Sequence, residues 1–409
     1  MMSTRTPALA AASLFAWLFG ACLEANGLGL DVDAGPVHAG DGGRDAGPPA
    51  PEDLDGYVQW EMEGHGIAGL AAVIVKDDAI AWTGRFGYAD LEAMTPVTEN
   101  TLFLVASISK TIVTVPIMQL AEERVIQLDA PVDAYLPYAV RHPGFPDVPI
   151  TARMLLTHTS GLEDDFIKLA MAMDPGMAPT TLAEFSEQYV TPGGALYGEH
   201  NWGARPGTDW SYCNAAYGVL GHLAEVAGGA SLPELTRTGV REPLGMTQSG
   251  WLGADVSADA MAVGYTWNGR AYTELEYEVM SYYPAGGFAT SVAELSRFLR
   301  AFIRLGELDG ARILEEETVH AMREPQVPSI ASGQGITWSY ERLAGATWLG
   351  HSGATLGGSA QMLFRPDDGT AIIVLTNSDA YVLARLGIRD TADALDRIVE
   401  RIAVEAGAI

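Results

Sequence analysis

Ser107 and Lys110 stand three residues apart in the stretch LVASISKTIV, residues 104–113. If this stretch is helical, the two side chains share a face and point into the same space. A serine hydroxyl becomes an effective nucleophile only when a base takes its proton. A lysine can be that base if burial or a positive neighbour lowers its pKa, and the apolar flanks FLVA and TIVTV provide a buried setting. The spacing therefore indicates nucleophilic catalysis.

An alternative is that Ser107 caps the helix and Lys110 is a solvated residue of its first turn. Two observations weigh against this alternative. Lysine is scarce in the chain, occurring otherwise only at Lys76 and Lys168. A positive charge is also disfavoured near a helix N-terminus. Taken alone, the pair leaves both interpretations open.

Two later motifs bear on the choice. The segment RPGTDWSYCNAAYG contains Tyr-Cys-Asn at residues 212–214, and WLGHSGATLGG contains His-Ser-Gly at residues 351–353. The order Ser-x-x-Lys, Tyr-x-Asn, then a basic residue-x-Gly resembles the serine β-lactamase and penicillin-binding-protein superfamily. The resemblance begins near Leu54 and reaches the C-terminus. It looks closest to the branch of class C β-lactamases, D-alanyl-D-alanine carboxypeptidases, D-aminopeptidases and family VIII esterases.

The resemblance implies a fold and an activity. The fold would be of the α/β (α+β) class, β-lactamase/transpeptidase-like, with an antiparallel sheet flanked by helices and an inserted all-α lobe. The activity would be that of a serine hydrolase that needs no metal or cofactor and forms an acyl-enzyme at Ser107. The substrate would be a small molecule or peptide: a D-amino-acid peptide, a peptidoglycan fragment, a β-lactam or a small ester. The alternative on the same fold is a penicillin-binding sensor or binding lipoprotein that deacylates slowly.

The same resemblance assigns further catalytic roles. Tyr212 would share a hydrogen-bond network with Ser107 and Lys110. A phenol held beside a lysine ammonium ionises more readily, so either Tyr212 or Lys110 would act as the general base, and the sequence leaves the choice open. The alternative for Tyr212 is a packed core tyrosine. Asn214 would donate its side-chain amide to a substrate carbonyl.

The third motif should lie on a strand that lines the cleft. Within GHSGA, His351, Ser352 and Gly353 would contact the substrate, and Gly353 would permit close approach of the substrate backbone. By the family pattern, the backbone N–H groups of Ser107 and Ala354 would form the oxyanion hole. One such donor typically lowers the barrier by about 3 kcal/mol.

Three residues near these motifs need separate interpretation. His351 stands where many relatives carry a lysine that holds a substrate carboxylate. Histidine is mostly neutral above its usual pKa of about 6.5, which weakens the case for efficient β-lactam hydrolysis; the alternative is an ordinary strand residue. His158, in LLTHTSGL, is interpreted as structural because the resemblance gives it no role in the chemistry. Cys213 lies between two site residues, and alternation along a strand would turn it away.

The elements that must position these residues follow from periodicity. Residues 54–66 predict a short amphipathic helix that ends at a glycine. Residues 70–76 and 79–87 predict a β-hairpin around a two-residue Asp-Asp turn. A mostly apolar helix should begin near Ser107, and Pro116 should bend it or shorten its first part.

Strands lie at both ends of the chain and helices lie in the middle. Helical patterns broken by Gly and Pro dominate residues 151–245. Strand-like runs return late and precede a helical C-terminus: 346–353, 357–369 and 370–378. We therefore expect an α/β lobe built from residues 54–106 and 285–409, with a helical lobe of residues 107–284 inserted between its two parts.

Composition excludes several classes of protein. The formal net charge of −28 argues against nucleic-acid binding, which needs a basic surface. The two cysteines, Cys22 and Cys213, exclude a disulfide framework and a CxxC zinc site. Neither HExxH nor the Gly-x-Ser-x-Gly elbow of α/β-hydrolases occurs. We therefore expect neither metal nor nucleic acid as a partner, and the oligomeric state stays open.

The N-terminus has the pattern of an export signal. The apolar run at residues 7–21 fits the core of a signal peptide better than a membrane span. Gly and Ala directly before Cys22 resemble the lipobox of bacterial lipoproteins, although Phe19 stands where Leu is usual. We expect residues 1–22 to be a signal peptide and Cys22 to be lipidated, which would give a membrane-attached periplasmic or outer-surface lipoprotein. Ordinary secretion and an uncleaved anchor are the alternatives. Residues 23–53, rich in Gly, Ala, Pro and Asp, predict a flexible linker.

Overall fold

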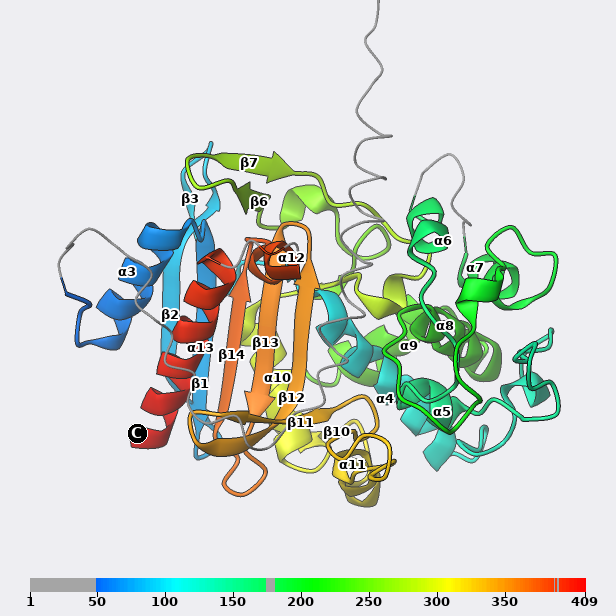
Figure 1. Cartoon of the computed structure of the whole chain (residues 1–409). Helices are drawn as coiled ribbons and strands as arrows, with labels where there is room; N and C mark the ends of the chain where they lie inside the picture. Colours follow the sequence, from blue (N-terminus) through cyan, green and yellow to red (C-terminus); the bar gives the residue numbers. More distant parts are fainter. Residues whose placement is uncertain (1–48, 174–180, 386, 388–389) are drawn as a thin grey trace, which may run out of the picture.

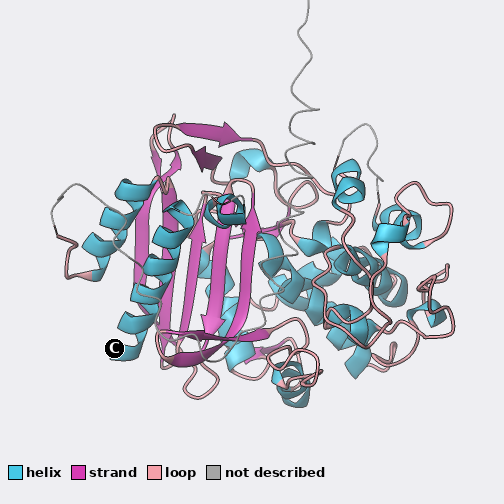
Figure 2. Ribbon diagram, in the orientation of Figure 1, coloured by secondary structure: helices cyan, strands magenta, loops and turns pink. Residues whose placement is uncertain are grey.

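A computed structural model describes residues 49–173, 181–385, 387 and 390–409 of the chain. Its main feature is a seven-stranded sheet in the order β11-β12-β13-β14-β1-β2-β3, in which every neighbouring pair is antiparallel. Figures 1 and 2 show helices on both faces of this sheet and a further group of helices beside the part of β12 that does not pair with β11. The predicted α/β class with an antiparallel sheet is confirmed. The strands of this sheet span Gly69–Lys76 (β1), Ala79–Asp90 (β2), Thr95–Pro96 (β3), Ser339–Leu343 (β11), Ala346–Thr355 (β12), Gly358–Phe364 (β13) and Ala371–Thr376 (β14).

The sheet joins the two ends of the folded chain. β1 comes from the N-terminal part and β14 from the C-terminal part, yet they pair directly, with Leu70 opposite Thr376 and Val75 opposite Ala371. Both strands are apolar along most of their length and almost fully buried. A continuous apolar strand has to be covered on both faces, so helices must pack on each side of it.

Alternate residues of β1 face two different hydrophobic cores. Leu70 and Ile74 pack in a core with α3 and the C-terminal helix α13. Val73 and Val75 belong to a larger core that includes α10 and the helical lobe. Figure 1 shows α13 on one face of the sheet and α10 on the other. The α-helices span Leu54–His65 (α3), Ser109–Glu122 (α4), Ala152–Leu156 (α5), Phe166–Met171 (α6), Leu182–Val190 (α7), Ala215–Gly228 (α8), Leu232–Thr236 (α9), Val292–Ile303 (α10), Glu316–Arg323 (α11), Ala380–Arg385 (α12) and Asp390–Ala408 (α13).

The predicted N-terminal helix and hairpin are both present. Asp53 caps α3 by accepting a hydrogen bond from the N–H of Gly56 at 2.8 Å, and Gly66 follows the helix in the left-handed conformation, with φ of 70°. The strands β1 and β2 are joined at Asp77 and Asp78, which have φ of 49° and 61°. Two successive residues with positive φ make the tight turn that matches the twist of a hairpin.

Helix α4 is buried between the sheet and the other helices beside it. Its residues from Ser109 to Met118 are all buried, and it packs against α8 and α9. The predicted helix therefore exists, but its first turn, Ala106–Ile108, is a 3₁₀ turn, η1, that contains Ser107. Pro116 does not interrupt the helix, which runs from Ser109 to Glu122.

Short strands connect the start of α4 to the sheet side of the molecule. β4 (Phe103–Leu104) pairs with β8 (Phe288–Thr290), and β8 pairs with β5 (Gly250–Trp251). A second small hairpin joins β6 (Gly264–Trp267) and β7 (Tyr272–Leu275), and another joins β9 (Glu307–Leu308) and β10 (Ala311–Arg312). The β4–β8 pairing matters most for the site, because it fixes the chain directly before Ser107.

The predicted signal peptide, the lipidation of Cys22 and most of the linker fall in residues 1–48, outside the described part of the chain. These assignments stay predictions. Within the described residues, no helix is both long enough and apolar enough to cross a membrane.

A partly buried ion pair joins the C-terminal helix to the N-terminal one. Arg397 of α13 donates two hydrogen bonds of 2.8 Å to the carboxylate of Glu61 of α3, which is 2% exposed. Burial opposes ionisation of Glu61, but the hydrogen bonds from Arg397 and His65 outweigh it and lower the pKa of Glu61 to about 2. Because the pKa of Glu61 is lowered in the folded state, its ionised carboxylate stabilises the fold at pH values above 4.5, the ordinary pKa of this group. This stabilisation is lost as the pH falls toward 2.

Glu61→Gln should therefore lower the free energy of unfolding at pH 7 by about 2 kcal/mol. The deficit should shrink as the pH falls from 4.5 toward 2, because over that range the unfolded wild-type chain binds a proton at Glu61 that the folded protein does not bind. Urea unfolding at pH 7 and near pH 3 measures both values. Glu63→Gln, which changes an exposed glutamate of the same helix, is the matched control. An equal deficit at both pH values would contradict this account of the pair.

Candidate active site

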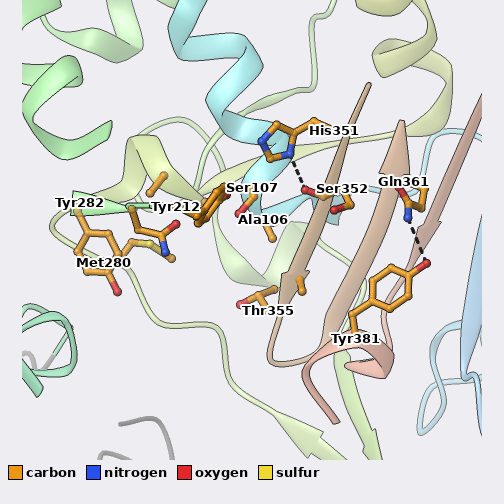
Figure 3. A pocket seen from close by; sticks show the side chains of 14 residues that line it. Ala106, Ser107, Tyr212, Met280, Tyr282, His351, Ser352, Thr355, Gln361 and Tyr381 are labelled. Carbon is orange, nitrogen blue, oxygen red and sulfur yellow. Dashed lines mark hydrogen bonds between the residues drawn. The ribbon is translucent and has the colours of Figure 1, made fainter. Parts of the chain in front are cut away.

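A cavity of about 220 Å³ lies where the β12 edge of the sheet meets the helical lobe (Figure 3). It brings together residues from all three sequence motifs. The predicted residues that line it are Ser107, Tyr212, Asn214, His351, Ser352 and Ala354. The other lining residues are Ala106, Met280, Tyr282, Ala285, Gly286, Thr355, Gln361 and Tyr381. Lys110 lies behind Ser107, and Gly353 packs behind the lining.

Lys110 is in direct contact with Ser107. Its side chain is fully buried (0% exposed), while Ser107 is partly exposed to the cavity. Lys110 Nζ donates hydrogen bonds to Ser107 Oγ at 3.1 Å, to Asn214 Oδ1 at 2.8 Å and to the carbonyl of Ala285 at 2.6 Å. The interpretation of Lys110 as a solvated first-turn residue is therefore wrong. Ser107 is not the helix cap either, since Val105 precedes η1 in that position.

The backbone directly before Ser107 is strained. Ala106 has φ of 46°, a left-handed conformation that is costly for a residue with a side chain. Two hydrogen bonds to Phe288 hold the segment: the N–H of Val105 donates to its carbonyl at 3.0 Å, and Ser109 Oγ accepts from its N–H at 2.9 Å. Strain of this kind persists only where the surroundings fix it, and here it turns Ser107 toward the cavity.

Tyr212 lies between a lysine and a histidine. Lys110 Nζ is 4.9 Å from the centre of the Tyr212 ring, and the His158 ring is 4.4 Å from it. His158 is buried, and its Nδ1 accepts a hydrogen bond from the N–H of Cys213 at 3.1 Å. Burial, followed by the charges of Lys110 and His351, lowers the pKa of His158 well below its usual value. His158 is thus a neutral support behind Tyr212, in agreement with its structural interpretation.

The Tyr-x-Asn motif does not lie on a strand. Residues 211–213 are irregular, and Asn214 directly precedes α8. Cys213 points away from the cavity as predicted, but the reason is different, because its buried thiol donates to Asp164 Oδ1 at 3.4 Å. Burial and the nearby Asp164 carboxylate raise the pKa of this thiol well above its ordinary value.

Asp164 is a site residue that sequence reasoning missed. Its buried carboxylate accepts hydrogen bonds from the backbone N–H groups of Asn214 and Ala215, both at 2.9 Å, and from Asn214 Nδ2 at 2.7 Å. Burial raises the pKa of Asp164, although these hydrogen bonds oppose the shift. Asp164 also orients the amide of Asn214, because Nδ2 faces the carboxylate and Oδ1 faces Lys110. The neighbouring acids Glu163 and Asp165 made this stretch resemble an ordinary polar loop.

The predicted donation by Asn214 to a substrate carbonyl stays a prediction. In the structure its amide bridges Lys110 and Asp164. An Asn side chain has two N–H bonds, so one remains for the cavity that Asn214 lines.

His351 lies on β12 and lines the cavity, so it is more than an ordinary strand residue. Its Nδ1 donates to the carbonyl of Ser352 at 2.7 Å, as Figure 3 shows. Because a carbonyl can only accept, Nδ1 carries the proton and Nε2 is the acceptor nitrogen of the neutral ring. Burial and the positive charge of Lys110 lower the pKa of His351 to about 4.

Gly353 is needed for a different contact from the one predicted. A Cβ at this position would lie 2.2 Å from the carbonyl oxygen of Val105 and 3.3 Å from the side chain of Ala106. The missing side chain therefore admits the chain that carries Ser107, and the predicted approach of the substrate to Gly353 stays a prediction. The pairing of β11 with β12 ends at Gly350, so this edge of β12 faces the site. The oxyanion hole of the Ser107 and Ala354 N–H groups stays a prediction, since both residues line the cavity.

The site contains no candidate metal centre. Among the described residues, no group of three or more His, Cys, Asp or Glu side chains is placed to hold a metal ion. The groups next to Ser107 that can take part in chemistry include its own hydroxyl, the amine of Lys110, the phenol of Tyr212 and the imidazole of His351.

The fold and this serine–lysine site define the class of protein. The chain belongs to the β-lactamase family, whose model, described as Beta-lactamase, matches residues 54–396. Penicillin-binding protein 4 of Amycolatopsis lactamdurans is 28% identical over 295 residues, which are 69% of this chain and 73% of that protein. Esterase EstB of Burkholderia gladioli is 29% identical over 203 residues, which are 49% of this chain and 52% of the esterase. The chain thus spans only about half the length of that esterase.

Solved structures show the same fold. The octameric penicillin-binding protein homologue from Pyrococcus abyssi superposes with a TM-score of 0.66 at 28% identity, covering 84% of this chain and 76% of that one. The D-amino acid amidase from Ochrobactrum anthropi SV3 gives a TM-score of 0.66 at 21% identity, covering 86% of this chain and 99% of the amidase. These similarities confirm the predicted β-lactamase/transpeptidase-like fold. The neighbours include hydrolases of more than one kind.

Asp164→Asn should lower kcat/KM at least tenfold while KM changes little, because the variant presents an amide N–H to the donors of Asn214 and Ala215. The pH profile of kcat/KM should shift as well, since Asn214 links Asp164 to Lys110. Steady-state rates from pH 5 to 9 with an activated ester test both. Asp165→Asn is the control, since the Asp165 side chain caps α6 and does not contact Asn214. A profile that keeps its shape would show that Asp164 is merely structural.

Gly353→Ala should displace the Ser107 segment, because the new Cβ meets the carbonyl oxygen of Val105 at 2.2 Å. We expect a loss of stability of about 1–3 kcal/mol and slower acylation of Ser107. Thermal unfolding and the rate of labelling by a serine-directed phosphonate measure the two effects. Gly345→Ala is the control for glycine loss in the same strand pair, since a Cβ there meets nothing within 4 Å, although its φ of 77° adds some strain. Unchanged labelling in Gly353→Ala would contradict the proposed contact.

Proposed function

We propose that the protein is a serine hydrolase that cleaves an ester or amide through an acyl-enzyme at Ser107. The observation that carries the proposal is the 3.1 Å hydrogen bond between Lys110 Nζ and Ser107 Oγ, which lies in a buried network beside an open cavity. Such a contact places the Lys110–Tyr212 pair, which can exchange a proton with the serine, next to a nucleophile, and this is the arrangement that activates a serine. The named activities of the relatives, an esterase and an amidase among them, support the same reaction class.

The first half-reaction joins the substrate acyl group to the enzyme. Ser107 Oγ attacks the carbonyl carbon, and its proton passes to the Lys110–Tyr212 pair, of which Lys110 is in direct contact with Oγ. The negative charge that develops on the carbonyl oxygen is stabilised by the N–H groups of Ser107 and Ala354. The bond to the leaving group then breaks, and the proton returns to the alcohol or amine that departs.

The second half-reaction releases the acid. Water gives its proton to the same pair and attacks the ester formed at Ser107, and Oγ recovers a proton as the acid leaves. The cavity of about 220 Å³ admits a small acyl group. Short-chain esters and small amides are therefore the substrates that the site supports best.

Ser107→Ala should abolish labelling by a fluorescent serine-directed phosphonate and reduce turnover of a short-chain p-nitrophenyl ester to the background rate. Lys110→Ala should lower kcat/KM about 10²–10⁴-fold, the range for loss of general acid–base catalysis. Ser329→Ala, which changes an exposed serine in the loop after α11, should leave both readouts unchanged. Labelling that persists in Ser107→Ala would refute the assignment. A burst of product without a steady-state rate would show that the protein is a covalent binder that deacylates slowly and not a hydrolase.

A further inference from the structure

The lining of the cavity carries no formal charge. Among its described residues there is no Asp, Glu, Lys or Arg. The titratable side chains are three tyrosines and His351, and burial raises the pKa of two of the tyrosines, Tyr282 and Tyr381, well above the ordinary value. A charged substrate group that enters this cavity therefore finds no opposite charge on its wall, and a charge removed from water without such a partner is unfavourable.

The positively charged side chain beside Ser107, Lys110, already makes hydrogen bonds within the protein. Lys110 is fully buried and does not line the cavity. Its Nζ donates to Ser107 Oγ, Asn214 Oδ1 and the carbonyl of Ala285, and an ammonium has three protons to donate. A substrate carboxylate would have to displace one of these acceptors to pair with Lys110.

His351 lines the cavity, and its neutral ring keeps one acceptor nitrogen. Its proton lies on Nδ1 and is donated to the carbonyl of Ser352 at 2.7 Å, which leaves the lone pair of Nε2 as the remaining polar group of the ring. A carboxylate oxygen placed against Nε2 would meet another acceptor. A neutral group with an N–H or O–H would instead find a partner. The lowered pKa of His351 keeps the ring in this form at neutral pH.

The surroundings add repulsion at longer range. The chain has a formal net charge of −28. The exposed residues Glu276 and Glu278 lie shortly before Met280, which lines the cavity. Fields of this kind reduce the local concentration of anions, and salt screens them.

We propose that this site selects substrates without a negative charge next to the scissile bond, so that neutral esters and amides react and carboxylate-bearing analogues are rejected. The proposal rests on the acyl-enzyme function proposed above. The selecting features are the uncharged lining, the commitment of Lys110 to three internal acceptors and the acceptor nitrogen of His351. Together these three features restrict the expected substrates to a narrower class than the fold alone indicates.

The test compares 3-acetoxybenzamide with 3-acetoxybenzoate, two acetate esters of similar size that differ in one charge. We expect kcat/KM, divided by the rate of hydroxide hydrolysis, to be about 10- to 100-fold higher for the amide-bearing ester. The ratio should persist in 0.5 M NaCl because the cavity acts at short range. His351→Lys should lower the ratio at least tenfold, whereas His351→Gln, which adds N–H donors but no charge, should lower it much less.

A kcat/KM ratio near one in the wild-type protein would overturn the proposal. A ratio that falls to near one in 0.5 M NaCl would also overturn it, because the selection would then come from the net charge of the protein and not from the cavity. The same comparison with a neutral phosphonate and its carboxylate-bearing match measures selection by the labelling rate of Ser107, without any turnover. Absence of both turnover and Ser107 labelling would instead refute the acyl-enzyme function. The two failures are thus distinguishable.

Discussion

A lysine amine buried in the centre of the protein constrains most of the surrounding structure. Taking an ammonium out of water is costly unless every proton finds an acceptor. Lys110 finds three acceptors, and they come from three separate segments: the turn η1, the residue before α8, and the chain before β8. These segments must converge for the lysine to be tolerated. The packing of α4, the position of α8 and the small β4–β8 pair all contribute to meeting this polar requirement.

The convergence is supported by a second group of contacts. Asp164 fixes the start of α8 and the direction of the Asn214 amide, while His158 supports Tyr212 and the backbone of Cys213. On the opposite side, Gly353 lets β12 approach the strained turn before Ser107. The nucleophile is thus held between a helical lobe and a sheet edge, and the open space between them is the cavity.

The sequence was informative where the signals are local. The hairpin at Asp77–Asp78 and the caps of α3 depend on neighbouring residues, and both were predictable. The Ser107–Lys110 pair was visible because three residues make one helical turn. The carbonyl of Ala285 could not be predicted, since a backbone acceptor leaves no mark in residue type. Asp164 was missed because it contacts Asn214, which lies 50 residues later in the chain. The contact of Gly353 was missed because its neighbour, Val105, is also far away in sequence.

The pairing of β1 with β14 also has a consequence in time. The chain emerges from the ribosome N-terminus first, so the edge of β1 that will meet β14 has no partner until residues 371–376 have been made. An unpaired apolar strand edge invites association with other chains. β12, which supplies His351 and Ala354, is also among the last parts to appear. The nascent protein therefore carries its nucleophile for most of its synthesis without the strand that completes the site, and it becomes competent to react only when the chain is nearly finished.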